Sequence, residues 1–313
     1  MARAKARRAR SRTSRRGWGG RILGWILKGI VLFILMSLAW VLLYRFVNPP
    51  VTFTMMGDVI GGRSATRDWM PLGEIDPDMK RAVIAAEDSK FCSHWGFDQD
   101  AIAAAMRRNA EGGGVIRGGS TISQQTAKNA FLWQGGGYFR KGLEAWFTLL
   151  IENIWGKQRI MEVYLNLAET GITTYGVNAG AQRYFGKDAS NLTRQEAARI
   201  AAVLPLPKKR EAVTPTGFTR RYGNSIAARI RVVARDNLDA CLDGSGRMEA
   251  VEPEGTPKTK AKAAPKQKQP VEPTPQPERA EDYIQPMNEP ETSSPAEPAP
   301  PPADTPPVVE PDE

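Results

Sequence analysis

The chain has 313 residues, of which 41% are hydrophobic, so it can bury one sizeable core besides any extra segments. Its formal net charge of +9 suits an anionic ligand or membrane face, but no stripe of Lys and Arg with interleaved aromatic residues argues for nucleic acid as a partner. The two cysteines, Cys92 and Cys241, belong to no CxxC motif and no His/Cys cluster, so the sequence argues against a structural zinc site. Whether they form a disulfide outside the cytoplasm is left open.

The first 47 residues combine a basic tail with an apolar segment. They contain eleven Lys or Arg and no acid, and residues 22–44 are apolar apart from Lys28. A helix of this length can cross a bilayer, whereas a cleaved signal peptide would have a shorter apolar core and a small-residue cleavage site. We therefore expect a basic cytoplasmic tail at 1–21 and a transmembrane helix at 22–47, with the rest of the chain outside the cytoplasm by the positive-inside rule.

The helical spacing of apolar residues predicts one mainly α-helical domain at residues 48–242. At its start, residues 51–56 favour a short strand followed by a turn, and Asp76-Pro77 is a good helix start. A glycine-rich loop is expected at residues 111–119. The expected helices cover residues 77–86, 99–108, 120–131, 138–155, 159–168, 176–184 and 193–205, with a last one marked by Ile226, Ile230 and Val233.

From residue 243 onward the composition changes abruptly. Residues 243–313 hold seventeen of the 24 prolines, fifteen acidic residues and seven basic ones, and large hydrophobic residues almost vanish. Such a segment cannot bury enough surface to offset its ordering entropy. We expect a disordered tail that is inert, acts as a tether or reaches a partner.

The stretch from Ala85 to Asp98, AAEDSKFCSHWGFD, is the first candidate site. It places two carboxylates, Glu87 and Asp88, where an apolar helix opens into an aromatic loop with the chain's one histidine, His94. A half-solvated carboxylate there can have a raised pKa that suits proton transfer, although ordinary surface acids also end helices in this way. The imidazole could carry a second proton or brace the loop by hydrogen bonds.

Two further stretches gather polar and charged side chains. Residues 118–131, GGSTISQQTAKNAF, place several of them on one helix face: Ser120, Gln124 and Lys128, with Thr121 and Gln125 beside them. In the next helix Arg140 and Glu144 are four residues apart and therefore lie together. Both patterns also fit a solvated helix face and a surface ion pair of little energetic value.

Together with residues 157–169, KQRIMEVYLNLAE, these stretches resemble the motifs of the peptidoglycan glycosyltransferase family, in that family's order and spacing. The resemblance extends from about Trp69 to Arg235 and is greatest to the monofunctional members, because the chain has no room for a transpeptidase domain. It implies a lysozyme-like α-helical domain on the periplasmic face of the bacterial inner membrane. It also implies that lipid II is polymerised into β-1,4-linked glycan strands with release of undecaprenyl diphosphate.

The resemblance assigns a role to each site residue. Glu87 corresponds to the general base on the 4-hydroxyl of the acceptor, and Glu144 to a second essential glutamate on the donor side. The positions that match substrate-binding residues are Lys128, Arg140 and Lys141 at the leaving diphosphate, Ser120, Thr121 and Gln125 in a polar groove, and Asp88 in the first motif. No cofactor or metal ligand set is required, although a divalent cation could associate with the diphosphate and Glu144.

The chemistry of these residue types agrees with the roles. A sugar hydroxyl is a weak nucleophile that must lose its proton, and the departing diphosphate gathers negative charge that needs stabilisation. One glutamate at a helix end and several Lys and Arg on neighbouring helices supply both functions. Since the donor linkage is α and the product is β, direct displacement inverts the anomeric centre without a covalent glycosyl-enzyme.

Two other functions remain open on the sequence alone. A membrane-bound lytic transglycosylase or muramidase shares the lysozyme-like fold and a catalytic glutamate, but it cleaves uncharged glycan and has no use for Lys128, Arg140 and Lys141. A non-catalytic scaffold would use its Pro-rich tail to recruit other cell-wall synthesis or division proteins, yet it would not need both Glu87 and Glu144.

Overall fold

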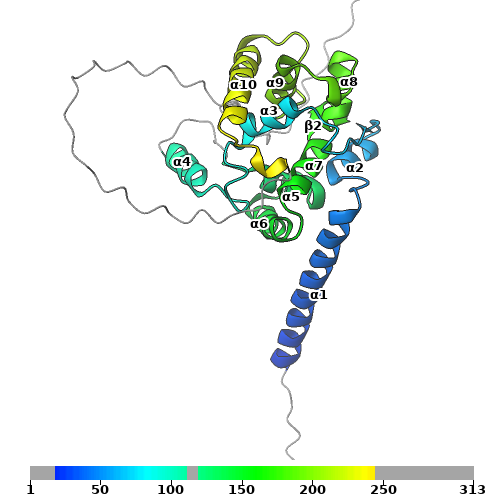
Figure 1. The fold of residues 1–313 in the computed structure, drawn as a ribbon. Helices are drawn as coiled ribbons and strands as arrows, with labels where there is room; N and C mark the ends of the chain where they lie inside the picture. The colour runs from blue at the N-terminus through cyan, green and yellow to red at the C-terminus, as the bar shows by residue number, and fades with distance from the viewer. Residues whose placement is uncertain (1–17, 111–118, 244–313) are drawn as a thin grey trace, which may run out of the picture.

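The structure is a computed structural model that describes residues 18–110 and 119–243. Within those ranges it is mainly α-helical, as predicted, and one long helix, α1 (Trp18–Phe46), extends from one side of a domain of shorter helices (Figure 1). The predictions for most of the basic tail, for nearly all of the glycine-rich loop and for the Pro-rich tail lie outside the described residues.

The helices predicted between residues 77 and 233 are all present, to within a few residues at their ends. After α1 the elements are α2 (Phe53–Ile60), β1 (Thr66–Arg67), α3 (Pro77–Glu87), α4 (Gln99–Ala110), α5 (Ile122–Phe131), α6 (Gly137–Ile154), α7 (Lys157–Leu167), β2 (Glu169–Gly171), β3 (Thr174–Tyr175), α8 (Val177–Phe185), the 3₁₀ helix η1 (Ala189–Asn191), α9 (Arg194–Val203), α10 (Gly217–Arg235) and the 3₁₀ helix η2 (Ala240–Leu242). Helix α3 begins as predicted, with Asp76 as N-cap and Pro77 in the first turn.

The segment before α3 differs from its prediction. The sequence favours a strand at residues 51–56, but this prediction is wrong, because helix α2 begins there. The Thr52 hydroxyl accepts a hydrogen bond from Met55 N at 3.1 Å and so caps the helix. Helix α2 then buries Asp58, whose carboxylate accepts a hydrogen bond of 2.5 Å from the Tyr175 hydroxyl. Capping and this distant contact outweigh the strand preference of the local residues.

Three very short strands form a sheet in the order β1–β3–β2, with β1 parallel and β2 antiparallel to β3. Strands of two or three residues are too short to show an alternating pattern, so the sequence does not predict them. Beside the sheet, the buried Asn166 amide donates to Met70 O and accepts from Met70 N, both at 2.8 Å. These bonds hold the segment that leads into α3 against the end of α7.

The core decides where the candidate site residues meet. Helix α3 packs against α9 and α10, and α5 packs against α6 and α7. Helix α10 buries Ile226, Ile230 and Val233, the residues whose spacing predicts it. Glu87 ends α3 and Lys128 lies in α5, and a hydrogen bond from Gln125 of α5 to Glu87 brings both residues to one region of the domain.

Helix α1 has 29 residues and a mean hydropathy of 2.5 over its most apolar window, enough by length and composition to cross a membrane. Trp18 is the first residue that the structure describes, so the helix includes the predicted transmembrane segment from residue 22 onward. Its buried side chains lie in its C-terminal half, which packs against α6. Trp155 Nε1 donates a hydrogen bond to Val41 O at 2.8 Å, and Trp146 Nε1 donates one to Ser37 Oγ at 3.1 Å.

Candidate active site

Glu87 is the last residue of α3, and its half-buried carboxylate faces α5. Gln125 Nε2 donates a hydrogen bond to Glu87 Oε2 at 2.9 Å. Burial raises the pKa of Glu87, whereas the Gln125 hydrogen bond and the charges of Arg210 and Lys128 act in the opposite direction. The pKa of Glu87 is raised on balance, as expected of a carboxylate that accepts a proton during a reaction.

Asp88, the next residue, has quite different surroundings. It is buried, and its carboxylate accepts hydrogen bonds from Ile122 N at 3.0 Å and from Nε2 of His94 at 2.9 Å. The bond to Ile122 reaches the first residue of α5, so Asp88 fixes the loop after α3 onto that helix. His94 therefore has the bracing position, and the Asp88 carboxylate is bonded within the protein.

The N-terminus of α5 corrects the predicted helix face. The helix begins at Ile122 and not at residue 120, and Thr121 is the N-cap, which forms a capping box with Gln124. The Thr121 hydroxyl also donates to a carbonyl of the loop after α3 at 2.6 Å. Thr121 and Gln124 are therefore buried in the packing of that loop, and the residues of α5 that interact with the Glu87 carboxylate are Gln125 and Lys128.

Lys128 interacts with two carboxylates at once. Its ammonium interacts electrostatically with Glu87 and with Glu144. Burial and the neighbouring charges of Arg140 and Lys141 lower the pKa of Lys128, and the two carboxylates raise it. Among the residues that the structure describes, none forms a hydrogen bond with this ammonium. Its interactions with Glu87 and Glu144 are electrostatic.

Glu144 is only 2% exposed and organises a cluster of cations on α6. Arg140 Nη1 donates to one of its oxygens at 2.5 Å, and Lys141 Nζ donates to the other. Lys141 also donates to Ser120 Oγ at 3.0 Å, which links α6 to the residue before the N-cap of α5. This arrangement is not the surface ion pair that the spacing alone allows, because the carboxylate is buried and must stay paired.

Three residues close to Glu87 were not predicted from the sequence. Arg210, between α9 and α10, Tyr222 of α10 and Tyr164 of α7 each interact electrostatically with the Glu87 carboxylate. They come from segments far along the chain, and no local pattern connects them to the first motif. The basic run PKKR, which ends at Arg210, is the signal that could have pointed to one of them.

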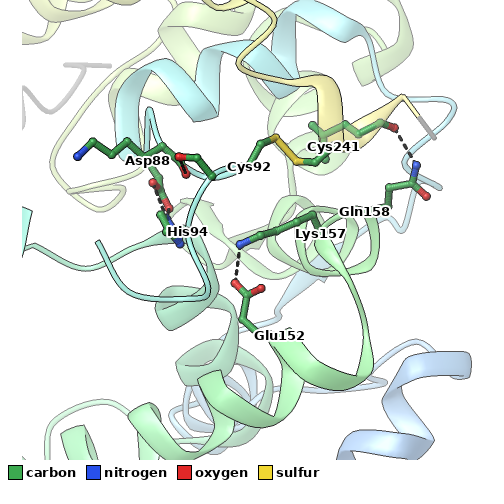
Figure 2. The surroundings of a disulfide bond; sticks show 10 residues. Asp88, Cys92, His94, Glu152, Lys157, Gln158 and Cys241 are labelled. Carbon is green, nitrogen blue, oxygen red and sulfur yellow. Dashed lines mark hydrogen bonds and ion pairs between the residues drawn. A yellow bond between two sulfur atoms is a disulfide. The ribbon is translucent and has the colours of Figure 1, made fainter. Parts of the chain in front are cut away.

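The loop between α3 and α4 is fixed from two sides, as Figure 2 shows. On one side Cys92 forms a disulfide with Cys241 of η2, with their Cα atoms 5.5 Å apart, which answers the question that the sequence leaves open. On the other side Lys157 Nζ lies 4.6 Å from the Phe91 ring centroid and donates to the buried Glu152 at 2.7 Å. The loop that carries Asp88 and its histidine partner is therefore held between covalent and ionic contacts.

Gly96 allows the same loop to approach α6 closely. Its φ is +79°, a left-handed conformation that favours glycine, and a Cβ at this position would lie 2.6 Å from Thr148 Cγ2. Its carbonyl is the one that accepts the hydrogen bond from Thr121. The loop, α5 and α6 thus meet at a position where a side chain has no room.

The described residues form one polar cluster with two chemical functions. Glu87 can accept a proton, and Lys128, Arg140 and Lys141 can hold an anion. Gln125, which is bonded to Glu87, lies three residues before Lys128 in α5, so the two functions are neighbours. Such a cluster is suited to moving a group from an anionic leaving group to a neutral hydroxyl.

Comparisons with known proteins cover the same region. Residues 54–233 match the family model described as Transglycosylase. A biosynthetic peptidoglycan transglycosylase of Caulobacter vibrioides is 48% identical over 228 residues, which are 71% of this chain and 99% of that protein. A protein of the same description from Pseudomonas putida is 50% identical over 230 residues, 71% of this chain and 96% of its own. One from Xanthomonas campestris is 49% identical over 208 residues, which are 64% of this chain and 84% of that protein.

Proposed function

Since this chain belongs to the transglycosylase family and is a peptidoglycan glycosyltransferase, we propose that it polymerises lipid II into β-1,4-linked glycan strands and releases undecaprenyl diphosphate. The observation that supports this reaction is the neighbourhood of a proton-accepting carboxylate, Glu87, and a cation cluster around Lys128 and Glu144. A polymerase that uses a diphosphate-activated sugar needs both functions in one site.

On the acceptor side, Glu87 takes the proton from the 4-hydroxyl of the N-acetylglucosamine. As the proton moves to the carboxylate, the hydroxyl oxygen forms a bond to C1 of the donor sugar. Gln125 holds the carboxylate in place through its 2.9 Å hydrogen bond. A positioned base of this kind contributes about 10²–10⁴-fold to the rate.

On the donor side, the bond between C1 and the diphosphate oxygen breaks, and its electron pair leaves with the diphosphate. Lys128, Arg140 and Lys141 bind the negative charge that develops there. Attack from the face opposite the leaving group converts the α linkage of the donor into the β linkage of the product. Glu144 acts through two of these cations, because it accepts hydrogen bonds from Arg140 and Lys141.

The other predicted substrate-binding residues divide into two groups. Gln125 is bonded to Glu87, and Ser120 is bonded to Lys141, and we propose that both contact the substrate. Asp88 and Thr121 use their side chains within the protein, so we assign them a supporting role in holding the loop after α3 against α5.

A divalent cation is not needed for charge neutralisation in this proposal. Three protein cations already surround the expected diphosphate position, and both oxygens of Glu144 accept hydrogen bonds from two of them. A divalent ion that associates with the diphosphate would therefore add to their effect and would compete for Glu144.

We further propose that α1 crosses the bacterial inner membrane with its N-terminus in the cytoplasm, so that the catalytic domain lies in the periplasm. A polyprenyl-linked substrate remains anchored in the bilayer, so the domain needs a membrane-facing surface. Exposed aromatic side chains support this: Phe53, Trp133, Tyr138 and Phe139. The rings of Phe53 and Trp133 lie 6.5 Å apart and thus belong to one surface. That other cell-wall synthesis or division proteins are partners of this chain remains a prediction.

The test separates a polymerase from a lytic enzyme. Purified protein is incubated with labelled lipid II and, in a parallel reaction, with finished peptidoglycan sacculi. We expect glycan polymer from lipid II and no soluble muropeptides from the sacculi, because the cation cluster serves an anionic leaving group that a glycan strand lacks. Muropeptide release without polymer would favour the lytic enzyme, and inactivity on both would favour the scaffold.

A further inference from the structure

Arg210 lies outside the four motifs and is held on several sides. The residue is 9% exposed, and its Nη1 donates a hydrogen bond to Ala202 O at 2.7 Å. The guanidinium lies 5.1 Å from the Phe218 ring centroid and 5.9 Å from that of Tyr222. A carbonyl and two aromatic faces are the surroundings that let a buried cation keep its charge.

Tyr222 connects this cation to the proposed base. Its hydroxyl donates a hydrogen bond to Ala86 O at 3.0 Å, and this carbonyl belongs to the residue directly before Glu87. One ring of α10 therefore contacts the Arg210 guanidinium on its face and the last turn of α3 through its hydroxyl. Displacement of the ring would move both groups.

Five titratable groups in the described part of the chain interact electrostatically with Glu87, each from a different element: Asp88 next to it, Lys128 of α5, Tyr164 of α7, Tyr222 of α10 and Arg210 of the connection before α10. The two cations lower the pKa of Glu87, and Asp88 raises it. Burial raises the pKa of both tyrosines, so they are neutral near neutral pH.

The two cations differ in what they do during the proposed reaction. Lys128 binds the leaving diphosphate, so its charge is shared with the substrate. Arg210 is held by Ala202 O and by the rings of Phe218 and Tyr222, and Tyr222 is bonded to the carbonyl directly before Glu87. We propose that Arg210 is a positioning residue that acts through Glu87: held against Tyr222, whose hydroxyl binds the carbonyl directly before Glu87, it places a fixed positive charge next to the base. This inference rests on the proposed role of Glu87 and names a group outside the motifs that governs it.

The pH dependence of the reaction tests the inference. Lipid II polymerisation by the full-length protein is measured between about pH 5 and 9, across the range where a tuned base titrates. Loss of a nearby positive charge in Arg210→Gln raises the pKa of Glu87, so we expect the acid limb of kcat/KM to move up by about 0.5–1 pH unit. At pH values below this limb, Arg210→Gln is then about 3–10-fold slower than the wild type, and the difference between the two rates narrows as the pH rises.

Matched variants separate charge from structure. Arg210→Lys retains the charge and should leave the acid limb close to its wild-type position. Arg199→Gln removes a guanidinium from α9 that donates to Val213 O at 3.3 Å in the same connection, and it should not move the limb. Tyr222→Phe deletes the bond to Ala86 and should lower kcat at every pH. If Arg210→Gln does not fold, Arg210→Met, which keeps an apolar stem between the rings, takes its place.

An Arg210→Gln profile with the wild-type acid limb overturns the inference, even if the variant is slow, because a merely structural role lowers the rate at all pH values. Glu87→Gln is assayed in parallel. If Glu87→Gln keeps its turnover, the proposed base is wrong. If it is inactive while the limb of Arg210→Gln stays in place, only the role of Arg210 is wrong.

Discussion

At the scale of single residues, Glu87 and Asp88 show how neighbouring carboxylates acquire different tasks. Helix α3 ends between them, so Glu87 faces a side chain of α5, whereas Asp88 joins the loop after α3 to the first amide of α5. Glu87 accepts one hydrogen bond from Gln125, whereas Asp88 accepts hydrogen bonds from a backbone amide and from His94. The Glu87 carboxylate is therefore left half-buried, and burial raises its pKa.

Glu87→Gln should abolish polymerisation, with a loss of at least about 10²-fold in kcat, because the variant keeps the shape of the side chain and removes the proton acceptor. Folding should survive, since an amide in this half-buried position carries no charge to desolvate. The assay is lipid II turnover together with thermal unfolding. The matched control is Glu74→Gln on the exposed surface, which should behave as wild type; near-normal turnover of Glu87→Gln would rule out the base assignment.

Lys128→Ala should lower kcat and weaken donor binding together, because the ammonium contacts an anion that gains charge as the bond breaks. A charge-assisted hydrogen bond is worth about 1.5–3 kcal/mol, or about 10–100-fold in kcat/KM. Steady-state kinetics with lipid II measure both constants, and Lys187→Ala, which breaks a partly exposed ion pair with Glu196, serves as control. A change in KM alone would mean that Lys128 binds ground state and transition state equally.

The sequence predicts which residues belong to the site, but it does not predict where their side chains point. Glu87, Lys128 and Glu144 are found in local motifs. The direction of Thr121 depends on which residue begins α5, and Arg210 reaches the base only through the packing of α10 on α3. Such contacts between distant segments leave no local periodicity from which to predict them.

At the scale of elements, the helices could be predicted because their apolar spacing and their caps agree. Helix α10 shows this, since its buried residues are the ones that mark its period. The exceptions are short elements. Helix α2 and the three strands depend on single capping or tertiary contacts, which outweigh weak local preference.

The disulfide between the loop after α3 and η2 gives a prediction at this scale. Cys92 and Cys241 are 149 residues apart in sequence, and closing so long a loop constrains the unfolded chain strongly. The double variant Cys92→Ser/Cys241→Ser should lose about 2–4 kcal/mol of unfolding free energy. Polymerisation should also fall, since the loop carries Asp88.

Thermal unfolding in detergent, with and without a thiol reductant, measures this. Reductant should lower the melting temperature of the wild type and leave the double serine variant unchanged. A wild type that contains two free thiols after denaturation without reductant would contradict the disulfide.

At the scale of the whole molecule, α1 and the domain are joined by specific contacts. The side chains of Trp146 and Trp155 donate hydrogen bonds to α1, and Arg159 donates to Tyr44 O at 2.9 Å. The ring of Trp40 meets Phe131 of α5 edge-on at 5.4 Å. Contacts of this kind continue the domain core into the helix, because Val41 and Tyr44 of α1 are buried in the same hydrophobic cluster.

This docking has a consequence for how the enzyme sits in its lipid environment. A helix of 29 residues is about 43 Å long, whereas a hydrocarbon layer is about 30 Å thick, so in the proposed membrane arrangement the docked end of α1 would stand above that layer. In that arrangement, the packing of α1 against the domain would set how deeply the exposed aromatic side chains named above enter the lipid head groups. Reconstitution into thicker or thinner bilayers would change this depth, and with it the rate at which a membrane-anchored polyprenyl substrate brings its sugar into the active site.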